Sequence, residues 1–116
     1  SALKMSYAGI TKGTTALGAM MMLAATRNGA AAGLRAELER SQPALLPWFQ
    51  RAIPAMFPKA YRFVGEMDEI ADFVGEDPAA KKLYEAISEF YTRLAKDFDG
   101  PHAETDALAD LLKKKN

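Results

Sequence analysis

The sequence has no cysteine and a single histidine, His102, among its 116 residues. Disulfide frameworks and zinc sites built from cysteine and histidine are therefore excluded, and no thiol nucleophile is present. Net charge is also absent, because 15 Lys and Arg residues balance 15 Asp and Glu residues. A general nucleic-acid binder is normally basic overall, so this balance argues against that class.

Long hydrophobic runs and common catalytic motifs are missing as well. The longest uncharged stretch, residues 13–26, is shorter than the about 20 residues that a membrane span needs. The sequence contains no dinucleotide-binding glycine pattern, P-loop, HExxH, GxSxG or EF-hand loop. No secretory signal is recognisable, and we expect a cytoplasmic protein with no membrane or nucleic-acid partner and no metal.

Apolar residues recur with the helical period along the chain, and no run alternates as a strand would. We therefore predict an all-α fold with one domain over residues 1–116. Helices are expected at residues 2–27, 31–40, 59–74 and 78–98, with a last helix after Gly100-Pro101. The proline-rich residues 41–58 are expected to form short or kinked helical turns.

The first predicted helix is long and carries few charges. Small residues line several of its sides, which permits close approach of neighbouring helices. We expect it to be the buried centre of the fold, because sparse charge on all sides is typical of a helix surrounded by protein. Its apolar stripe at helical spacing consists of Leu3, Tyr7, Ile10, Leu17, Met21 and Ala24.

The balanced total conceals an asymmetry between the two halves of the chain. Residues 1–65 carry eight basic and two acidic residues, whereas residues 66–116 carry seven basic and thirteen acidic residues. The net charge is therefore +6 in the first half and −6 in the second. A positive field around the first helix suits an anionic ligand.

Most titratable residues fit structural roles. The acidic residues from Glu66 onward are expected to form a solvated helix face, and Arg62 and Glu66 have the spacing of an ion pair within one helix. His102 is expected to be a surface cap of the last helix.

Lys4 invites a chemical interpretation because it opens the first helix. Residues 4, 7, 8 and 11 share one face of that helix, which places an amine, a phenol, a methyl group and a hydroxyl side by side. Burial of an amine at this edge would disfavour its charged form and suit proton transfer. Alternatively, Lys4 simply extends its ammonium group into solvent at a helix end, which is the reading that periodicity alone favours.

The segment Lys4-Met5-Ser6-Tyr7-Ala8-Gly9-Ile10 resembles the Lys-Met-x-x-x-Gly-Ile segment of 6-phosphogluconate dehydrogenase-like, or β-hydroxyacid dehydrogenase, enzymes. Residues 62–71 resemble a less characterised subgroup of that superfamily, and the similarity covers roughly residues 1–98. In these enzymes the lysine begins an all-helical C-terminal domain that follows a nucleotide-binding Rossmann domain. The resemblance implies that this partner domain would precede Ser1, outside the chain.

The resemblance implies oxidation of a small anionic hydroxy acid with NAD or NADP. Lys4 would take the proton from the substrate hydroxyl, and the substrate would lie near Tyr7, Ala8, Thr11 and Glu66. At these four positions the relatives have histidine, asparagine, glutamate and lysine, so the substrate and any decarboxylation stay open. The cofactor would be bound mainly by the Rossmann domain, which makes the isolated chain inactive.

Two other readings stay open beside the dehydrogenase. One is a free-standing helical interaction module without catalysis, and the other is a domain of an imine-reductase-like enzyme. In the enzyme readings we expect a homodimer in which the first helix is partly shielded by another chain.

Overall fold

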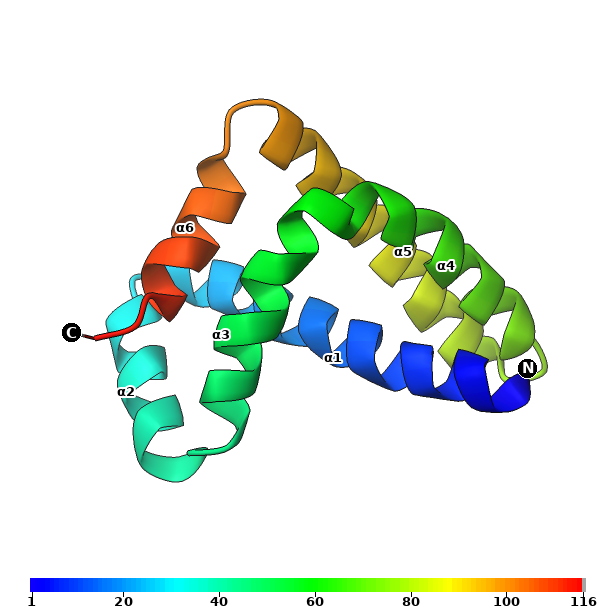
Figure 1. The fold of residues 1–116 in the computed structure, drawn as a ribbon, viewed down its shortest axis with the longest axis horizontal. Coiled ribbons are helices and arrows are strands. Elements are labelled where there is room, and N and C mark those ends of the chain that lie inside the picture. Colours follow the sequence, from blue (N-terminus) through cyan, green and yellow to red (C-terminus); the bar gives the residue numbers. More distant parts are fainter. Residues whose placement is uncertain (116) are drawn as a thin grey trace.

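The computed structural model describes residues 1–115, and every regular element in that range is a helix (Figure 1). The predicted all-α fold is therefore confirmed. The elements are α1 (Ala2–Arg27), α2 (Ala31–Ser41), α3 (Leu45–Met56), a short 3-10 helix η1 (Phe57–Lys59), α4 (Ala60–Phe73), α5 (Pro78–Asp99) and α6 (Ala103–Leu112). No helix of this described range is long and apolar enough to cross a membrane.

Helix α1 runs along the whole molecule and the other helices pack on it in two groups. Helices α4 and α5 form a hairpin that lies against its first half (Figure 1). Helices α2, α3 and α6 gather around its second half (Figure 1). Among the described residues, the two groups leave one side of α1 largely exposed.

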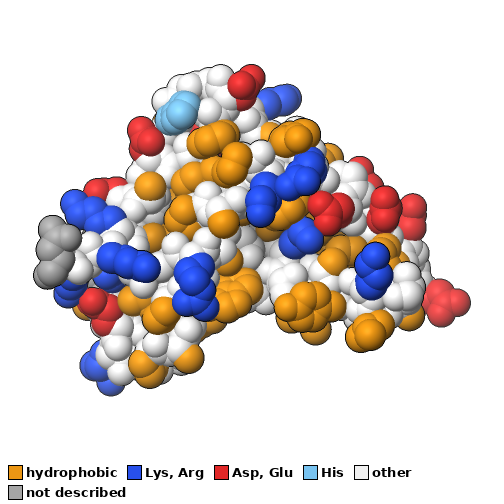
Figure 2. Space-filling view, in the orientation of Figure 1, with side chains coloured by type: hydrophobic (Ala, Val, Ile, Leu, Met, Phe, Trp, Pro, Cys, Tyr) orange, Lys and Arg blue, Asp and Glu red, His pale blue; other side chains and the backbone are white. Residues whose placement is uncertain are grey.

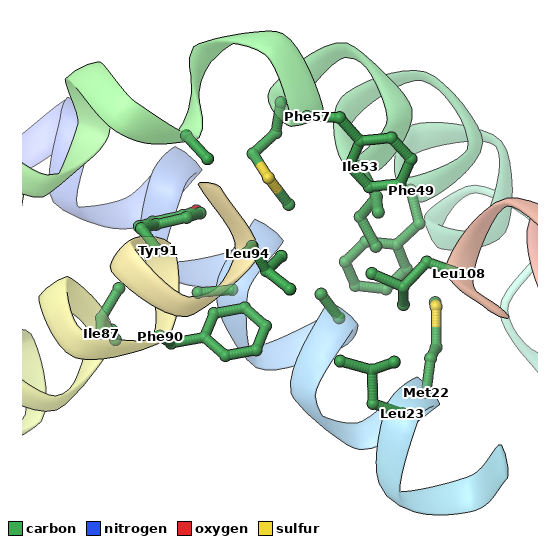
Figure 3. Close-up of a cluster of buried hydrophobic side chains, with 14 of the residues drawn as sticks. Met22, Leu23, Phe49, Ile53, Phe57, Ile87, Phe90, Tyr91, Leu94 and Leu108 are labelled. Atoms are coloured by element: carbon green, nitrogen blue, oxygen red, sulfur yellow. The ribbon is translucent and has the colours of Figure 1, made fainter. Parts of the chain in front are cut away.

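The hydrophobic core lies where the second half of α1 meets α3, α5 and α6 (Figure 3). Each helix contributes apolar residues spaced three or four positions apart, so that one stripe of each faces inward. Large side chains that are less than a tenth exposed fill this centre: Met22, Leu23, Phe49, Ile53, Phe90, Tyr91, Leu94 and Leu108.

The bounds predicted for α1 are confirmed, but the expectation that the helix is surrounded by protein on all sides is wrong within the described residues. The five large residues of its apolar stripe are exposed, with exposed fractions from 49% for Leu17 to 79% for Leu3, whereas Ala24 is half-buried. The buried face instead carries the small residues, among them Gly9, Gly13 and Ala16. Side chains this small let α4 and α5 approach the α1 backbone closely, which the large residues of the stripe would prevent.

The proline-rich segment also differs from the prediction, because α3 is one continuous helix. Pro47 lies in its first turn, where a backbone N–H has no partner within the helix, so the missing donor costs nothing. Pro54 lies near its end, and the chain tightens into η1 soon after. Phe49 and Ile53 of this helix are buried.

Helices α5 and α6 both begin at an aspartate cap. Asp77 accepts hydrogen bonds from the backbone N–H groups of Ala79 and Ala80 at the start of α5. His102 is exposed and occupies the residue before α6, but its side chain caps nothing. Asp97 at the end of α5 caps α6 instead, across a tight turn.

Candidate functional site

Lys4 lies in the first turn of α1 and is exposed. Its backbone N–H donates to Oγ of Ser1 over 3.3 Å, and its ammonium group makes no ion pair within residues 1–115. The burial that would favour a neutral amine is therefore not supplied by these residues. Any desolvation of Lys4 has to come from a surface that covers this end of α1.

The other predicted site residues of α1 extend along the same helix. Tyr7 is exposed, whereas Ala8 and Thr11 are half-buried. The Thr11 hydroxyl donates to the carbonyl oxygen of Tyr7 over 3.2 Å, so it offers only lone pairs to a ligand. With a rise of about 1.5 Å per residue, Thr11 lies about 10 Å from Lys4 along the helix axis.

Glu66 reaches α1 through Lys12, which was not among the predicted site residues. Its Oε1 lies 3.0 Å from Nζ of Lys12, and the same ammonium group lies 4.8 Å from the ring centre of Phe63. The predicted pair between Arg62 and Glu66 is not formed among the described residues. Lys12 is one of only three charged residues on α1. A charge on so apolar a helix could have marked Lys12 as a candidate site residue from the sequence alone.

Two tyrosines of α5 anchor α1 beside this ion pair. The Tyr84 hydroxyl donates to the carbonyl oxygen of Gly9 over 2.7 Å, and the Tyr91 hydroxyl donates to that of Lys12. Burial raises the pKa of Tyr91 well above its usual range, and the negative charges of Glu66 and of an ionised Tyr84 raise it further. Tyr91 therefore stays a neutral hydrogen-bond donor, and it holds the backbone of α1 at Lys12 in place against α5.

A groove lies between α1 and α3 beside Lys12. It consists of two adjoining hollows of about 210 and 450 Å³, which share Thr11 and Trp48 in their linings. We call it the α1–α3 groove, and its lining includes Thr11, Lys12, Leu45, Trp48, Lys59 and Phe63. Figure 2 shows the surface hollowed between α3 and the first half of α1, with basic side chains close by. Lys4 does not line this groove.

The N-termini of α5 and α6 are poor places for a pyrophosphate group. The N-terminus of α5 is filled by the carboxylate of Asp77, and that of α6 by the carboxylate of Asp97. Both negative charges would repel a phosphate from the N–H groups that could otherwise bind it. No group of three His, Cys, Asp or Glu side chains able to hold a metal occurs within residues 1–115.

Comparison with known proteins identifies a family for this chain. A family model described as a domain of unknown function, DUF1932, matches residues 25–94, more than half of the chain. The chain belongs to the DUF1932 family. No curated protein and no solved structure matches it significantly. In this DUF1932 chain, the match extends from the end of α1 into α5; it includes Glu66, Lys59 and Trp48 and leaves Lys4 outside.

Proposed function

We propose that this chain is the C-terminal, substrate-binding and dimerisation domain of an NAD- or NADP-dependent oxidoreductase that acts on a small anionic hydroxy acid. Family membership supports this proposal, because DUF1932 is the C-terminal helical domain of NAD(P)-binding dehydrogenase-like proteins. The resemblance of residues 4–10 to the lysine segment of 6-phosphogluconate dehydrogenase-like enzymes supports it independently.

The observation that carries the proposal is the exposed apolar stripe of α1 next to Lys4. We call the residues Leu3, Tyr7, Ile10, Leu17 and Met21 the α1 stripe. They repeat every three, four or seven residues, so they lie in one row along the helix, with Thr14 between Ile10 and Leu17. A row of exposed apolar residues of this length on a protein surface marks a place where another domain or subunit packs.

Covering the α1 stripe would also change the environment of Lys4. Leu3 and Tyr7 stand directly beside Lys4, so a nucleotide-binding domain or second subunit on this row would exclude water from the amine. Loss of water disfavours the ammonium form and favours a neutral amine that can accept a proton. In the proposed reaction Lys4 takes the proton of the substrate hydroxyl.

The cofactor belongs to the preceding domain in this proposal. When bound, it would supply the hydride chemistry, while this chain binds and orients the substrate. The carboxylates of Asp77 and Asp97 at the helix N-termini of α5 and α6 support this division, because they leave no suitable anion site for the pyrophosphate there. The first half of the chain, residues 1–65, has a net charge of +6, and this excess supports a positive field that suits an anionic substrate.

The decisive experiment uses the full-length protein that contains this domain. Its upstream sequence should encode a glycine-rich nucleotide-binding unit, and formation of NADH or NADPH is measured with a panel of hydroxy acids. Lys4→Ala is expected to lower kcat by about 10²–10⁴-fold, the usual contribution of a general base. Lys82→Ala removes an exposed lysine of α5 and serves as the matched control, with turnover unchanged.

Other outcomes of that experiment identify the competing functions. Turnover of cyclic imines but not of hydroxy acids would identify an imine reductase. Wild-type activity in the Lys4→Ala variant would remove Lys4 from the mechanism. Absence of a nucleotide-binding unit upstream, together with no turnover, would leave a helical interaction module.

A further inference from the structure

The α1–α3 groove combines an apolar wall with two amines. Trp48 and Leu45 of α3 form part of the wall, and Phe63 of α4 closes one end. Lys12 and Lys59 line the same end of the groove as Phe63. A pocket that pairs an apolar wall with a few charged groups is typical of a small-molecule site.

The two amines differ in how they are engaged. Lys12 is held by Glu66 and by the face of Phe63, and the hydroxyl of Tyr91 fixes its backbone. Lys59 is exposed and makes no ion pair within residues 1–115. Together with Glu66 they give this end of the groove a net charge of +1, which one carboxylate would neutralise.

We infer that the α1–α3 groove binds an amphipathic monocarboxylate, with its apolar body against Trp48 and its carboxylate paired with Lys59 and the ion-paired Lys12. Glu66 disfavours a ligand of higher negative charge at the same place, because the second charge would lie near its carboxylate. Use of the ligand as substrate rests on the proposed function, whereas binding itself needs neither the cofactor nor Lys4.

Trp48 makes the inference directly measurable. It is the single tryptophan of the chain, and it contributes to both hollows of the groove. Its fluorescence therefore reports changes in the surroundings of this groove, without a background from other tryptophans. Hexanoate and hexanamide are suitable probes, because they have the same alkyl body and differ in charge.

The experiment titrates this chain with each probe at low ionic strength and follows Trp48 emission. Hexanoate is expected to bind with a dissociation constant on the order of 1 mM, typical for a ligand of so few atoms. Hexanamide is expected to bind at least about threefold more weakly, and added salt should reduce the difference.

Three variants test the assignment of the charges. Lys59→Met should weaken hexanoate binding about threefold and leave hexanamide binding unchanged, whereas Lys59→Arg should retain it. Glu66→Gln removes the competing anion and should strengthen hexanoate binding by a similar factor. Lys82→Met makes the same charge change on α5, outside the groove lining, and should have no effect. Circular dichroism confirms that each variant is folded.

Equal responses to hexanoate and hexanamide would overturn the inference, and so would a Glu66→Gln variant that binds hexanoate no better. An unchanged Trp48 spectrum at saturating concentrations of both probes would do the same. These outcomes are separate from failure of the proposed function, which is judged by turnover and by Lys4 in the full-length enzyme.

Discussion

Tyr84 of α5 donates its hydroxyl hydrogen bond to the backbone carbonyl of Gly9 in α1 over 2.7 Å. A methyl group at Gly13, one turn further along, would lie 2.9 Å from the same hydroxyl oxygen. The contact thus depends on two residues without side chains on the buried face of α1. It holds α1 in place while its opposite face, with the α1 stripe, remains uncovered.

The two tyrosine hydroxyls should each contribute modestly to stability. We expect Tyr84→Phe and Tyr91→Phe to lower the free energy of unfolding by about 1 kcal/mol each, the usual net value of one hydrogen bond. The helical carbonyls of Gly9 and Lys12 keep their partners within the helix, so no acceptor is left unsatisfied. Urea unfolding measures the effect, with the exposed Tyr61→Phe as control. Equal stability of all three variants would contradict the structural role.

Gly18 and Gly65 should respond oppositely to the same substitution. A Cβ at Gly18 would collide with the ring of Phe49, which is buried and has no space to move, whereas one at Gly65 would meet nothing within 4 Å. Gly18→Ala is expected to destabilise the protein by about 1–3 kcal/mol through overpacking. Gly65→Ala should stabilise it by up to about 1 kcal/mol through helix propensity. Thermal unfolding compares the two, and stabilisation by both would show that α1 and α3 pack less closely.

Asp97 should make stability depend on pH in the acidic range. Burial raises the pKa of its carboxyl, but hydrogen bonds from Thr105 and Glu104 lower it more, so the folded-state pKa lies below the ordinary value. A depressed folded-state pKa gives stability that is present above the unfolded-state pKa of about 4 and is lost as the pH falls through the folded value.

The variant Asp97→Asn isolates this contribution. Asn keeps a side-chain oxygen as acceptor but removes the negative charge at the N-terminus of α6, so the variant should cost about 0.3–1 kcal/mol at pH 7. The difference from wild type should shrink below about pH 4. Denaturant unfolding at several pH values measures it. Asp99→Asn changes an exposed carboxylate two residues away and serves as control. A difference that stays constant down to pH 2 would rule out titration of Asp97 as its cause.

The α1 stripe should govern self-association if a second copy covers it. We expect Leu17→Glu and Met21→Glu to shift sedimentation toward monomer and to leave the unfolding midpoint of the monomer nearly unchanged, since both side chains are exposed. Leu83→Glu alters an exposed leucine of α5 and should leave association as in wild type. A wild-type chain that is monomeric at all concentrations would leave only another domain as the partner of this row.

The predicted elements succeeded where local signals were strong. Asn28-Gly29 ended α1 and Asp77-Pro78 began α5 at the expected places, because caps and prolines act within a few residues. The core residues of α4 and α5 also followed the helical period, as Met67 and Leu94 illustrate. The candidate site was harder to predict from the sequence. Lys12 and Lys59 were not predicted as site residues, because they line a groove only together with Trp48 and Phe63 from other helices.

The sequence by itself determined that this chain is helical, where most helices begin and end, and that its first half is basic. These properties depend on hydrogen bonding, capping and charge over short distances. Only the tertiary structure decided which face of α1 is buried, because both the large apolar residues and the small ones recur with a helical spacing. Close packing against Tyr84 and Phe49 selected the small residues, which left the α1 stripe exposed beside Lys4.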